Sequence, residues 1–334
     1  MVLILGKEVG STGYGLMGLT WRAVPPSQEQ AFAAMREAIS QGNVFWNGGE
    51  IYGTPEYNSM TLLSAYFEKY PEDADKVILS IKGGMVPGAH PGTLKADGSP
   101  EGTRRSLDNI IRQLNGRKKV DLFEFARRDQ TVDMRITFET IQKEYIDTGK
   151  IGGISLSEVR AETIHEAAKI AKICAVEVEL SLFATEVFDN GVAAACAEYN
   201  IPLVAYSPIC RGFLTGRFKT FEDIPQDSFV RHMPRFQLGG NFEHNIQLVH
   251  QVEALAQKKG CTLAQLAISW VRCLNGRPGM PVIIPIPGAT TAERVKENAK
   301  EVVLTAEEMA SIDTILAGFT TLGNRYPDAV AVDT

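Results

Sequence analysis

Cysteine and long apolar runs are both scarce in this sequence, and each shortage excludes a class of protein. The five cysteines among 334 residues are widely spaced, with no CxxC pair and no histidine at metal-ligand spacing. They are typical of free thiols in a reducing compartment. No segment approaches the roughly 20 apolar residues of a membrane helix, and the apolar N-terminus stops at Lys7, too early for a signal peptide. We therefore predict a protein of the cytosol or nucleus, with no membrane contact and no metal site.

Positive charge is not in excess either. The formal net charge is -6, whereas nucleic acids and anionic membranes bind proteins with a basic surface. The sequence also lacks a GxGxxG motif after its first strand-like run, a P-loop and an HExxH motif. These absences argue against a nucleic-acid partner, a doubly wound nucleotide-binding fold and a zinc hydrolase. Nothing in the sequence indicates an obligate protein partner.

Short β-branched or aromatic runs alternate with amphipathic helical patterns along most of the chain, which is typical of a parallel sheet with crossover helices. The runs are GLMGLT (15–20), VFWNG (44–48), VILSIK (77–82), VDLFEFA (120–126), GISLS (153–157), CAVEVELSL (174–182), PLVAYSP (202–208) and VIIPIP (282–287). Because eight such strands close a barrel, we predict an α/β fold, a (β/α)8 TIM barrel formed by a single domain over residues 1–334.

Segments outside the eight strands complete this prediction. Residues 1–13 carry turn signals at Gly6 and Gly10 and predict an N-terminal β-hairpin that can plug the bottom of the barrel. Residues 211–245 are too long for an ordinary βα connection, which is typical of a functional loop. Residues 304–316 predict a C-terminal helix, and an irregular loop segment follows it.

In a barrel of this kind the active site lies at the carboxyl ends of the strands. Tyr52 closely follows the second run and Lys82 ends the third. Because an ammonium group stabilises a nearby phenolate, we expect Lys82 to lower the pKa of Tyr52 from about 10 towards the working pH. Tyr52 can then donate a proton to a carbonyl. The alternative is that Tyr52 packs on the barrel rim and Lys82 is a solvated charge.

Six segments carry a more specific signal. They are NGGEIYG (47–53), IKGG (81–84), GISLSE (153–158), VAYSPICRGFLTGRF (204–218), PRFQLGGNF (234–242) and PIPGATTAERVKEN (285–298). In order and spacing the chain resembles the aldo-keto reductase superfamily over nearly its whole length. The segments FWNGGEIYG (45–53) and DLFEFARRD (121–129) are most similar to the pyridoxal reductase branch of that superfamily.

This resemblance implies NADPH as the cofactor, bound extended across the barrel mouth. It implies that Tyr206 stacks on the nicotinamide ring and that Ser157, Glu158 and Glu177 occupy the positions that fix the carboxamide. The family prefers Gln at position 177, and a carboxylate can accept from the amide NH2 but cannot donate to its oxygen. The other implied cofactor contacts are Ser207, Leu214, Gly216, Arg217, Arg294, Glu297 and Asn298.

The charged members of that set suit the phosphates of the cofactor. Leu214, Gly216 and Arg217 match the loop that covers the pyrophosphate in similar proteins, where backbone NH groups and a cation offset its charge. Arg294 matches the position that faces the 2′-phosphate. Because an Arg fork suits a phosphate dianion, the resemblance favours NADPH over NADH.

Two of the four catalytic residues of the superfamily are missing. Alignment on Tyr52 and Lys82 places Asn47 where Asp stands in the family and Ala126 where His stands. Without the Asp, Lys82 either loses its proton more easily or stays charged and unpaired, in which case it stabilises the Tyr52 phenolate more strongly. We expect the second outcome, because the cofactor phosphates and partial solvation tolerate one cation.

The missing His also changes the predicted substrate pocket. Ala126 widens it, and Trp21 and Trp46 lie near strand ends, where they either wall a ring-binding pocket or belong to the core. Pyridoxal suits such a pocket, since its hydroxyl lies beside the aldehyde and can polarise the carbonyl without a His. Arg127 and Arg128 are alternative donors, although adjacent Arg residues at a strand end are more often surface charges.

The sequence thus predicts an enzyme that reduces an aromatic aldehyde with NADPH, with pyridoxal to pyridoxine as the leading hypothesis and Tyr52 as the general acid. Two alternatives stay open. The missing Asp and His suit a slow NADP(H)-binding sensor or regulatory subunit, and the wide pocket suits a broad-specificity aldehyde reductase. The retained Tyr52 and Lys82 favour chemistry over binding alone.

Overall fold

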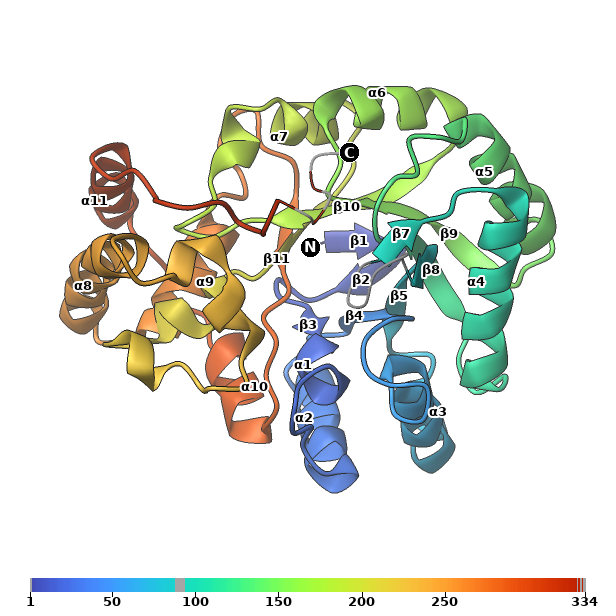
Figure 1. Cartoon of the computed structure of the whole chain (residues 1–334), viewed down its shortest axis with the longest axis horizontal. Coiled ribbons are helices and arrows are strands. Elements are labelled where there is room, and N and C mark those ends of the chain that lie inside the picture. Colours follow the sequence, from blue (N-terminus) through green and yellow to red (C-terminus); the bar gives the residue numbers. More distant parts are fainter. Residues whose placement is uncertain (1, 88–93, 329, 331, 333–334) are drawn as a thin grey trace.

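A computed structural model describes residues 2–87, 94–328, 330 and 332 of the chain. In these residues eight parallel strands form one curled sheet in the order β12, β11, β10, β9, β8, β5, β4 and β3. The strands are β3 Tyr14–Gly15, β4 Phe45–Gly49, β5 Ile78–Gly83, β8 Val120–Phe125, β9 Ile151–Ser157, β10 Ile173–Glu179, β11 Leu203–Tyr206 and β12 Ile283–Pro285. A parallel bridge between Gly15 and Gly288 joins the two ends of the sheet. The predicted (β/α)8 barrel is confirmed (Figure 1).

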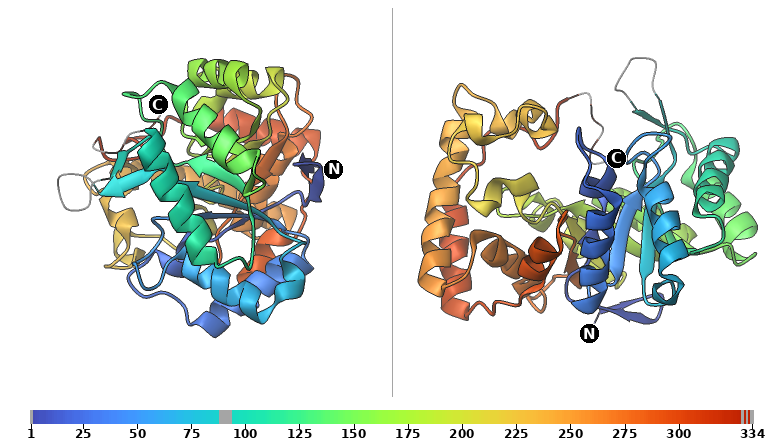
Figure 2. Two further views of the ribbon diagram at one scale, coloured as in Figure 1. Left: turned by 90° about the vertical axis from the view of Figure 1, so that its right-hand side faces the viewer. Right: turned by 90° about the horizontal axis from the view of Figure 1, so that it is seen from below.

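Helices cover the outside of this sheet (Figure 1, Figure 2). Their bounds are α1 Met17–Thr20, α2 Gln28–Ser40, α3 Ser59–Lys69, α4 Pro100–Leu114, α5 Met134–Ile141, α6 Ala161–Ile170, α7 Val192–Glu198, α8 Asn241–Lys259, α9 Leu263–Cys273, α10 Ala292–Ala299 and α11 Ala306–Ala317. The helix α2 illustrates why they form. Ser27 caps its first turn by accepting from Gln30 N at 3.2 Å, and one face, with Phe32 and Met35, is buried against the sheet side of the core.

The long connection at 211–245 folds into short turns of helix before α8 begins. These turns are η4 Cys210–Thr215, η5 Phe221–Asp223, η6 Phe229–His232 and η7 Pro234–Phe236. Their aromatic residues make a local core, in which the Phe213 ring lies 4.8 Å from Phe236 and 5.4 Å from Phe242. The segment therefore has a fixed shape, which brings the side chain of Arg211 towards the barrel mouth. Other short turns are η1 Pro71–Asp73, η3 Glu186–Phe188 and the π-helical turn η2 Gln142–Ile146.

The barrel interior changes character along the strands. Near the amino ends the inward side chains are apolar and include Phe45, Ile78 and Leu122, which belong to one buried cluster. Side chains alternate between the two faces of a strand, so the next inward positions on these strands are Asn47, Ser80 and Glu124. All three are buried and polar. The apolar lower layer thus supports a polar layer at the carboxyl ends, where the active site of this fold lies.

The N-terminal hairpin closes the apolar end, as predicted. Its strands β1 Val2–Ile4 and β2 Lys7–Val9 pair antiparallel, and the turn between them uses Gly6 at φ +76°. Ile4 and Val9 are buried in the same cluster as the lower interior residues of the barrel. The hairpin therefore excludes water from the end of the barrel that is opposite to the site.

The prediction for the first strand was wrong in its bounds. Residues 15–20 were expected to be a strand, but the strand is Tyr14–Gly15 and residues 17–20 form the helix α1. The strand is short because the closing seam is tight: a Cβ at Gly15 would lie 2.9 Å from Ile286 O. A small hairpin of β6 Met85–Pro87 and β7 Leu94–Ala96 was also not predicted.

The segment after α11 returns across the molecule to the barrel mouth (Figure 1). Backbone groups of this C-terminal segment are held by side chains of α8 and η7. His244 Nε2 lies 2.8 Å from Thr320 O, Asn245 Nδ2 donates to Leu322 O at 2.9 Å, and Arg235 Nε donates to Gly323 O at 3.3 Å. These contacts direct Arg325 and Tyr326 towards the polar end of the barrel. No helix in the described residues is long and apolar enough to span a bilayer.

Candidate active site

Tyr52 lies in the turn that follows β4, and its ring is enclosed on two sides. The ring stacks on Trp21, with centroids 5.2 Å apart and an interplanar angle of 27°. A Cβ at Gly49 would lie 3.0 Å from three atoms of the ring, so a larger residue there would press on Tyr52. Thr20 Oγ1 donates to Tyr52 O at 2.7 Å and fixes the backbone. The residue is 9% exposed, with a neighbour, Trp21, that is 45% exposed and can wall a pocket.

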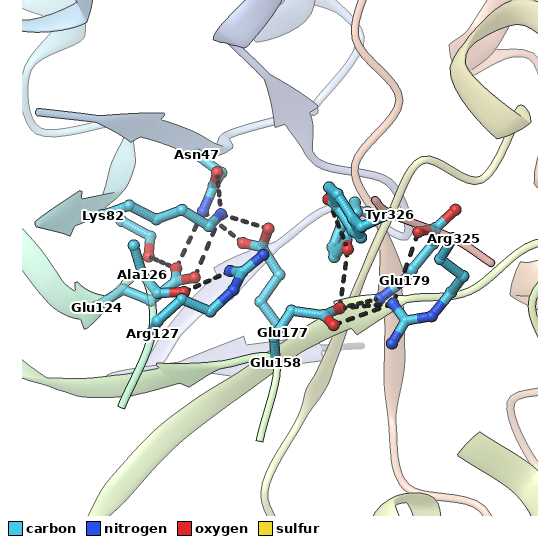
Figure 3. Close-up of polar contacts among 12 residues, drawn as sticks. Asn47, Lys82, Glu124, Ala126, Arg127, Glu158, Glu177, Glu179, Arg325 and Tyr326 are labelled. Atoms are coloured by element: carbon cyan, nitrogen blue, oxygen red, sulfur yellow. Dashed lines mark hydrogen bonds and ion pairs between the residues drawn. The ribbon is translucent and has the colours of Figure 1, made fainter. Parts of the chain in front are cut away.

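Lys82 is the last residue but one of β5 and lies at the centre of a buried polar group (Figure 3). Its Nζ donates to Asn47 Oδ1 at 2.9 Å, lies 3.2 Å from Glu124 Oε1 and forms a short contact with Glu177 Oε1. Asn47 Nδ2 donates to Glu124 Oε2 at 3.1 Å and to Glu177 Oε2 at 2.6 Å. Ser80 Oγ donates to Glu124 Oε2 at 3.1 Å. Four strands therefore bring one ammonium group, one amide and two carboxyl groups together.

The expectation that Lys82 is charged but unpaired was half right. Burial alone would lower the pKa of Lys82, but the carboxyl groups of Glu124 and Glu177 outweigh it and raise that pKa above its ordinary value. Lys82 is therefore charged, but it is paired with two acids from other strands. The sequence argument failed because it considered only position 47 as a source of negative charge.

The two acids do not carry equal charge. Burial, followed by the nearby charge of Glu124, raises the pKa of Glu177 to about 8, and a hydrogen bond between the two carboxyl groups acts in the same direction. At neutral pH Glu177 therefore keeps a proton. With Lys82 protonated, the group then has one positive and one negative charge, a balance that a buried site can hold.

The expected direction of the Tyr52 pKa was wrong. Burial raises the pKa of Tyr52 to about 12, although the charge of Lys82 acts to lower it. Desolvation wins because the ring is enclosed and because Glu177 and Glu124 offset part of the effect of Lys82. Tyr52 is consequently a neutral phenol at neutral pH, which is the protonation state that a proton donor requires.

A small, buried residue, Ala126, occupies the position where the family has His. Ala126 is 6% exposed, and its NH donates to Gly83 O at 3.1 Å. The adjacent Arg127 was expected to be a surface charge, but it is half-buried, donates to Ala126 O and lies 5.8 Å over the ring of Tyr326. It therefore faces the barrel mouth. Trp46 is core, fully buried with Nε1 donating to Asn43 O at 2.9 Å, and does not wall the site.

A second polar group lies at the ends of β9, β10 and β11. Tyr206 Oη donates to Glu158 Oε1 at 2.8 Å and lies 3.0 Å from Tyr326 Oη. Arg325 Nη1 lies 3.0 Å from both oxygens of Glu158 and 3.6 Å from Glu179 Oε2. Burial alone would raise the pKa of Glu158, but Arg325 outweighs it and lowers that pKa. The C-terminal segment thus supplies the cation for carboxylates of the barrel.

The nicotinamide positions implied by sequence are adjacent in the structure. Ser157 ends β9 and Glu158 follows it, Glu177 is on β10, and Tyr206 ends β11 with Ser207 directly after it. Glu158 and Ser207 both have φ of +52°, a left-handed conformation that is costly for residues other than glycine and is concentrated at functional sites. Ser157 Oγ is buried and has no hydrogen-bond partner within the described residues. A buried hydroxyl without a partner fits the amide group of a nicotinamide cofactor.

The phosphate positions lie on a different side of the mouth. Arg217 follows η4 and Arg294 is on α10, and both side chains are exposed. Partial burial, followed by the positive charge of Arg217, lowers the pKa of Arg294, so the two cations are near enough to repel each other. Such a pair favours a bound anion. Gly216 has φ of +71°, and a Cβ there would meet Glu253 Oε1 at 3.0 Å.

The remaining predicted cofactor residues are Leu214, Glu297 and Asn298, and their side chains are buried or half-buried. Leu214 is fully buried, so only its main chain can face a ligand. Glu297 is half-buried, and its carbonyl accepts from Gln265 Nε2 at 3.2 Å. Asn298 is buried on α10 next to it. The structure therefore places the predicted residues in two groups, one at the strand ends and one between η4 and α10.

Sequence reasoning missed Glu124 and Glu179 as site residues, although a signal for both was present. In the strand DLFEFA (121–126), Glu124 lies on the same face as the buried Leu122, and in CAVEVE (174–179) Glu179 shares a face with Ala175. An acid in the inward series of a buried strand indicates a functional or paired charge. Arg325 and Tyr326 had no such signal, because they follow the last helix in an irregular segment.

Comparison with known proteins agrees with this architecture. The model of the Aldo/keto reductase family matches residues 12–317. Over 98% of its length the chain is 42% identical to the probable pyridoxal reductase 2 of Schizosaccharomyces pombe, 97% of which is covered. Over 94% of its length it is 38% identical to the putative pyridoxal reductase of Saccharomyces cerevisiae, 95% of which is covered. A glycerol dehydrogenase from Gluconobacter oxydans has the same fold, with a TM-score of 0.80 and 22% identity over 99% of this chain and 98% of that one.

The chain belongs to the aldo/keto reductase family. It is an oxidoreductase of the class that reduces aldehydes and ketones, and the cofactor of this family is generally NAD(P)H. The predicted family and the predicted enzyme class are both confirmed.

Proposed function

We propose that this protein reduces an aromatic aldehyde with NADPH, that pyridoxal is its substrate and pyridoxine its product, and that Tyr52 is the general acid. The observation that carries the proposal is the arrangement at the polar end of the barrel, where the Tyr52 ring stacks on Trp21 after β4 and Lys82 on β5 is paired with two acids. The charge of Lys82 acts on the neutral Tyr52 phenol. The two fungal relatives named as pyridoxal reductases support the choice of substrate.

The cofactor supplies the hydride, and the chain supplies the site that holds it. Ser157 has a buried hydroxyl free to bond the carboxamide, and the half-buried ring of Tyr206 offers a flat surface to the nicotinamide. Arg217 and Arg294 suit the phosphates, since guanidinium groups form paired hydrogen bonds with phosphate oxygens. NADPH carries a 2′-phosphate in addition to the pyrophosphate, and this extra phosphate can pair with the second of the two arginines. The site therefore favours NADPH over NADH.

Tyr52 and Lys82 divide the proton chemistry between them. The Tyr52 hydroxyl gives its proton to the oxygen of the aldehyde as negative charge develops there. The phenolate that remains is stabilised by the Lys82 ammonium, whose charge already acts on Tyr52 in the resting protein. Since Glu177 keeps its proton at neutral pH, the site does not place a second negative charge next to the new phenolate.

The pocket at this place suits a planar ring. Ala126 leaves space where the family has His, and Trp21 stacks beside Tyr52 at the open side. Arg127 brings a cation to the mouth, where it can bind an oxygen substituent of the substrate. Pyridoxal carries a hydroxyl next to its aldehyde, so it matches both the space and the charge. A plain aliphatic aldehyde matches neither.

The test compares NADPH oxidation with pyridoxal, benzaldehyde and a short aliphatic aldehyde, using the wild type and Tyr52→Phe. We expect preference for pyridoxal, a higher rate with NADPH than with NADH, and a loss of about 100-fold or more in kcat for Tyr52→Phe. Tyr57→Phe is a matched control, because the Tyr57 hydroxyl has no hydrogen-bond partner within the described residues. Equal rates with all aldehydes indicate a general reductase, and tight NADPH binding without turnover indicates a sensor. Either result contradicts the proposal.

A further inference from the structure

The parallel strands β5 and β8 place Lys82 directly opposite Glu124. In the register of this pair Ser80 faces Leu122 and Lys82 faces Glu124, so both charged side chains point into the barrel from neighbouring strands. On the other side of β5, Asn47 faces Ser80. The interior of the barrel therefore brings Glu124 to Lys82 through the register of the sheet.

Glu124 is held at both of its carboxyl oxygens. Oε2 accepts from Ser80 Oγ and from Asn47 Nδ2, each at 3.1 Å, and Oε1 lies 3.2 Å from Lys82 Nζ. The residue is 1% exposed. A carboxylate fixed by two neutral donors and one cation cannot turn away from Lys82 without losing several buried hydrogen bonds.

Asn47 is a neutral link in the same group. Its Oδ1 accepts from Lys82, and its Nδ2 donates to both Glu124 and Glu177. An Asp at this position could not donate these two hydrogen bonds, and it would bring a third carboxyl group into a buried site with a single lysine. In this chain the buried carboxylate that contacts Lys82 from the β8 side is therefore that of Glu124, and position 47 on β4 carries no charge.

We propose that Glu124 is a positioning residue for the reduction, supplying from β8 the carboxylate that position 47 lacks and holding the Lys82 ammonium next to Tyr52. The inference rests on the proposed function for the reaction itself. Glu124 is assigned this role over Glu177, which also contacts Lys82, because Glu124 lies opposite Lys82 in the strand register and is fixed by Ser80 and Asn47. Glu177 lies on β10, at one of the nicotinamide positions. Glu124 acts through Lys82 and does not touch the substrate.

The test moves the carboxylate from one strand to the other. Three variants are compared with the wild type: Glu124→Gln, Asn47→Asp, and the double variant that carries both changes. We expect Glu124→Gln to lower kcat about 10-fold or more, with little change in KM, because Lys82 loses the partner that holds its ammonium next to Tyr52. Removing the Glu124 charge by itself lowers the pKa of Tyr52, so the fall comes from the displaced ammonium and not from a weaker acid. The double variant should recover most of that loss, because its carboxylate again faces Lys82.

Two further readouts separate positioning from a structural role. Glu177 titrates near pH 8 in the wild type, and the groups that face it are Glu124, Lys82 and Tyr52. Without the Glu124 charge, Glu177 should ionise at lower pH as the new partner of Lys82, so the alkaline limb of kcat/KM moves to lower pH in Glu124→Gln. In thermal unfolding, Asn47→Asp alone should lower Tm, and adding Glu124→Gln should restore it.

The control is Asp121→Asn, which removes another buried acid of β8. Asp121 pairs with Lys118 at 2.7 Å and accepts from Leu79 N, away from the site. This variant should lower Tm but leave kcat and its pH profile unchanged.

If Glu124→Gln behaves as Asp121→Asn does, and Asn47→Asp does not rescue it, the positioning role is wrong while the Tyr52 result still stands. If pyridoxal is not reduced but another aldehyde is, the proposed substrate fails and the same variants are compared on that aldehyde. Absence of turnover with every aldehyde overturns both.

Discussion

Lys82 lies among an amide and two carboxyl groups that compete for its three protons, and this competition sets the charge of the site. Glu124 and Glu177 face it from β8 and β10, and Asn47 bridges them from β4. Because Lys82 is positive, one acid is negative and Glu177 keeps its proton, the group is neutral overall. The chemistry proposed for Tyr52 depends on that balance, because each additional negative charge nearby raises the pKa of Tyr52.

The raised pKa of Glu177 makes the free energy of unfolding depend on pH. Between about pH 4.5 and pH 8 the folded chain holds a proton on Glu177 that the unfolded chain has released. The free energy of unfolding contributed by this group therefore falls as pH rises through that window. We expect the wild-type Tm to decrease more than that of Glu177→Gln when the pH is raised from about 5 to about 9.

The matched control for this pH series is Glu293→Gln, an exposed acid on α10 whose pKa is lowered, chiefly by a backbone hydrogen bond. Its variant should follow the wild-type curve across the same range. Parallel curves for the wild type and Glu177→Gln would show that Glu177 is ionised at neutral pH in the folded protein, contrary to the charge balance described above.

At the scale of an element, the segment after α11 provides charge to the barrel. Arg325 lies 3.0 Å from Glu158 and 3.6 Å from Glu179, and Tyr326 contacts Tyr206. The segment is placed by Asn245 on α8, which exchanges two hydrogen bonds with Leu322. Its arginine therefore faces the residues that resemble the nicotinamide contacts of the family.

We predict that Arg325→Met binds the oxidised cofactor more tightly relative to the reduced one. The oxidised nicotinamide ring is cationic and can replace the positive charge removed from beside Glu158. Two unit charges about 8 Å apart interact by about 2 kcal/mol at an effective dielectric constant of about 20. If the oxidised ring restores half of that energy, about 1 kcal/mol, the ratio of the two dissociation constants shifts about fivefold. Fluorescence titration with both cofactor forms measures the ratio. Arg277→Met, which removes an exposed pair with Asp313, should leave it unchanged.

A ratio that stays constant in Arg325→Met, or that moves towards the reduced cofactor, would mean that the arginine does not act on the nicotinamide positions. The segment would then serve only to cover the barrel mouth. Measuring Tm for both arginine variants checks that each protein remains folded during the titrations.

At the scale of the whole molecule, the two ends of the barrel have separate tasks. The lower end is apolar and closed by the N-terminal hairpin, whereas the upper end is polar and carries the site. The two ends consist of different side chains. A substitution at the apolar end should therefore change stability without changing the chemistry of the polar end.

This division predicts the effect of Ile4→Ala. Ile4 is 1% exposed and packs in the lower cluster, so its truncation should lower the free energy of unfolding by about 2 to 4 kcal/mol through lost burial and a residual cavity. The kcat of the folded enzyme should not change. Leu3→Ala is the control, because Leu3 is 54% exposed on the same strand and should lose little. Chemical or thermal unfolding and initial rates measure both effects, and a large fall in kcat with Ile4→Ala would contradict the separation of the two ends.

Features that depend on local pattern can be predicted from the amino-acid sequence alone. Alternating strand and helix signals predicted the barrel and its hairpin, and strand ends predicted where Tyr52 and Lys82 would lie. These signals persist over many residues, so small errors, such as the bounds of β3, do not change the fold.

The charges that meet inside the barrel are set by the folding of the whole chain. Lys82 and Glu177 are 95 positions apart, and Glu158 and Arg325 are 167 positions apart. Their contacts depend on strand register, on the closing of the sheet and on the return of the C-terminal segment. The pKa of Tyr52 likewise follows from its burial and from the charges of Lys82, Glu177 and Glu124, which lie on other strands. Electrostatic energies depend on distance and on exclusion of water, and both are properties of the folded chain.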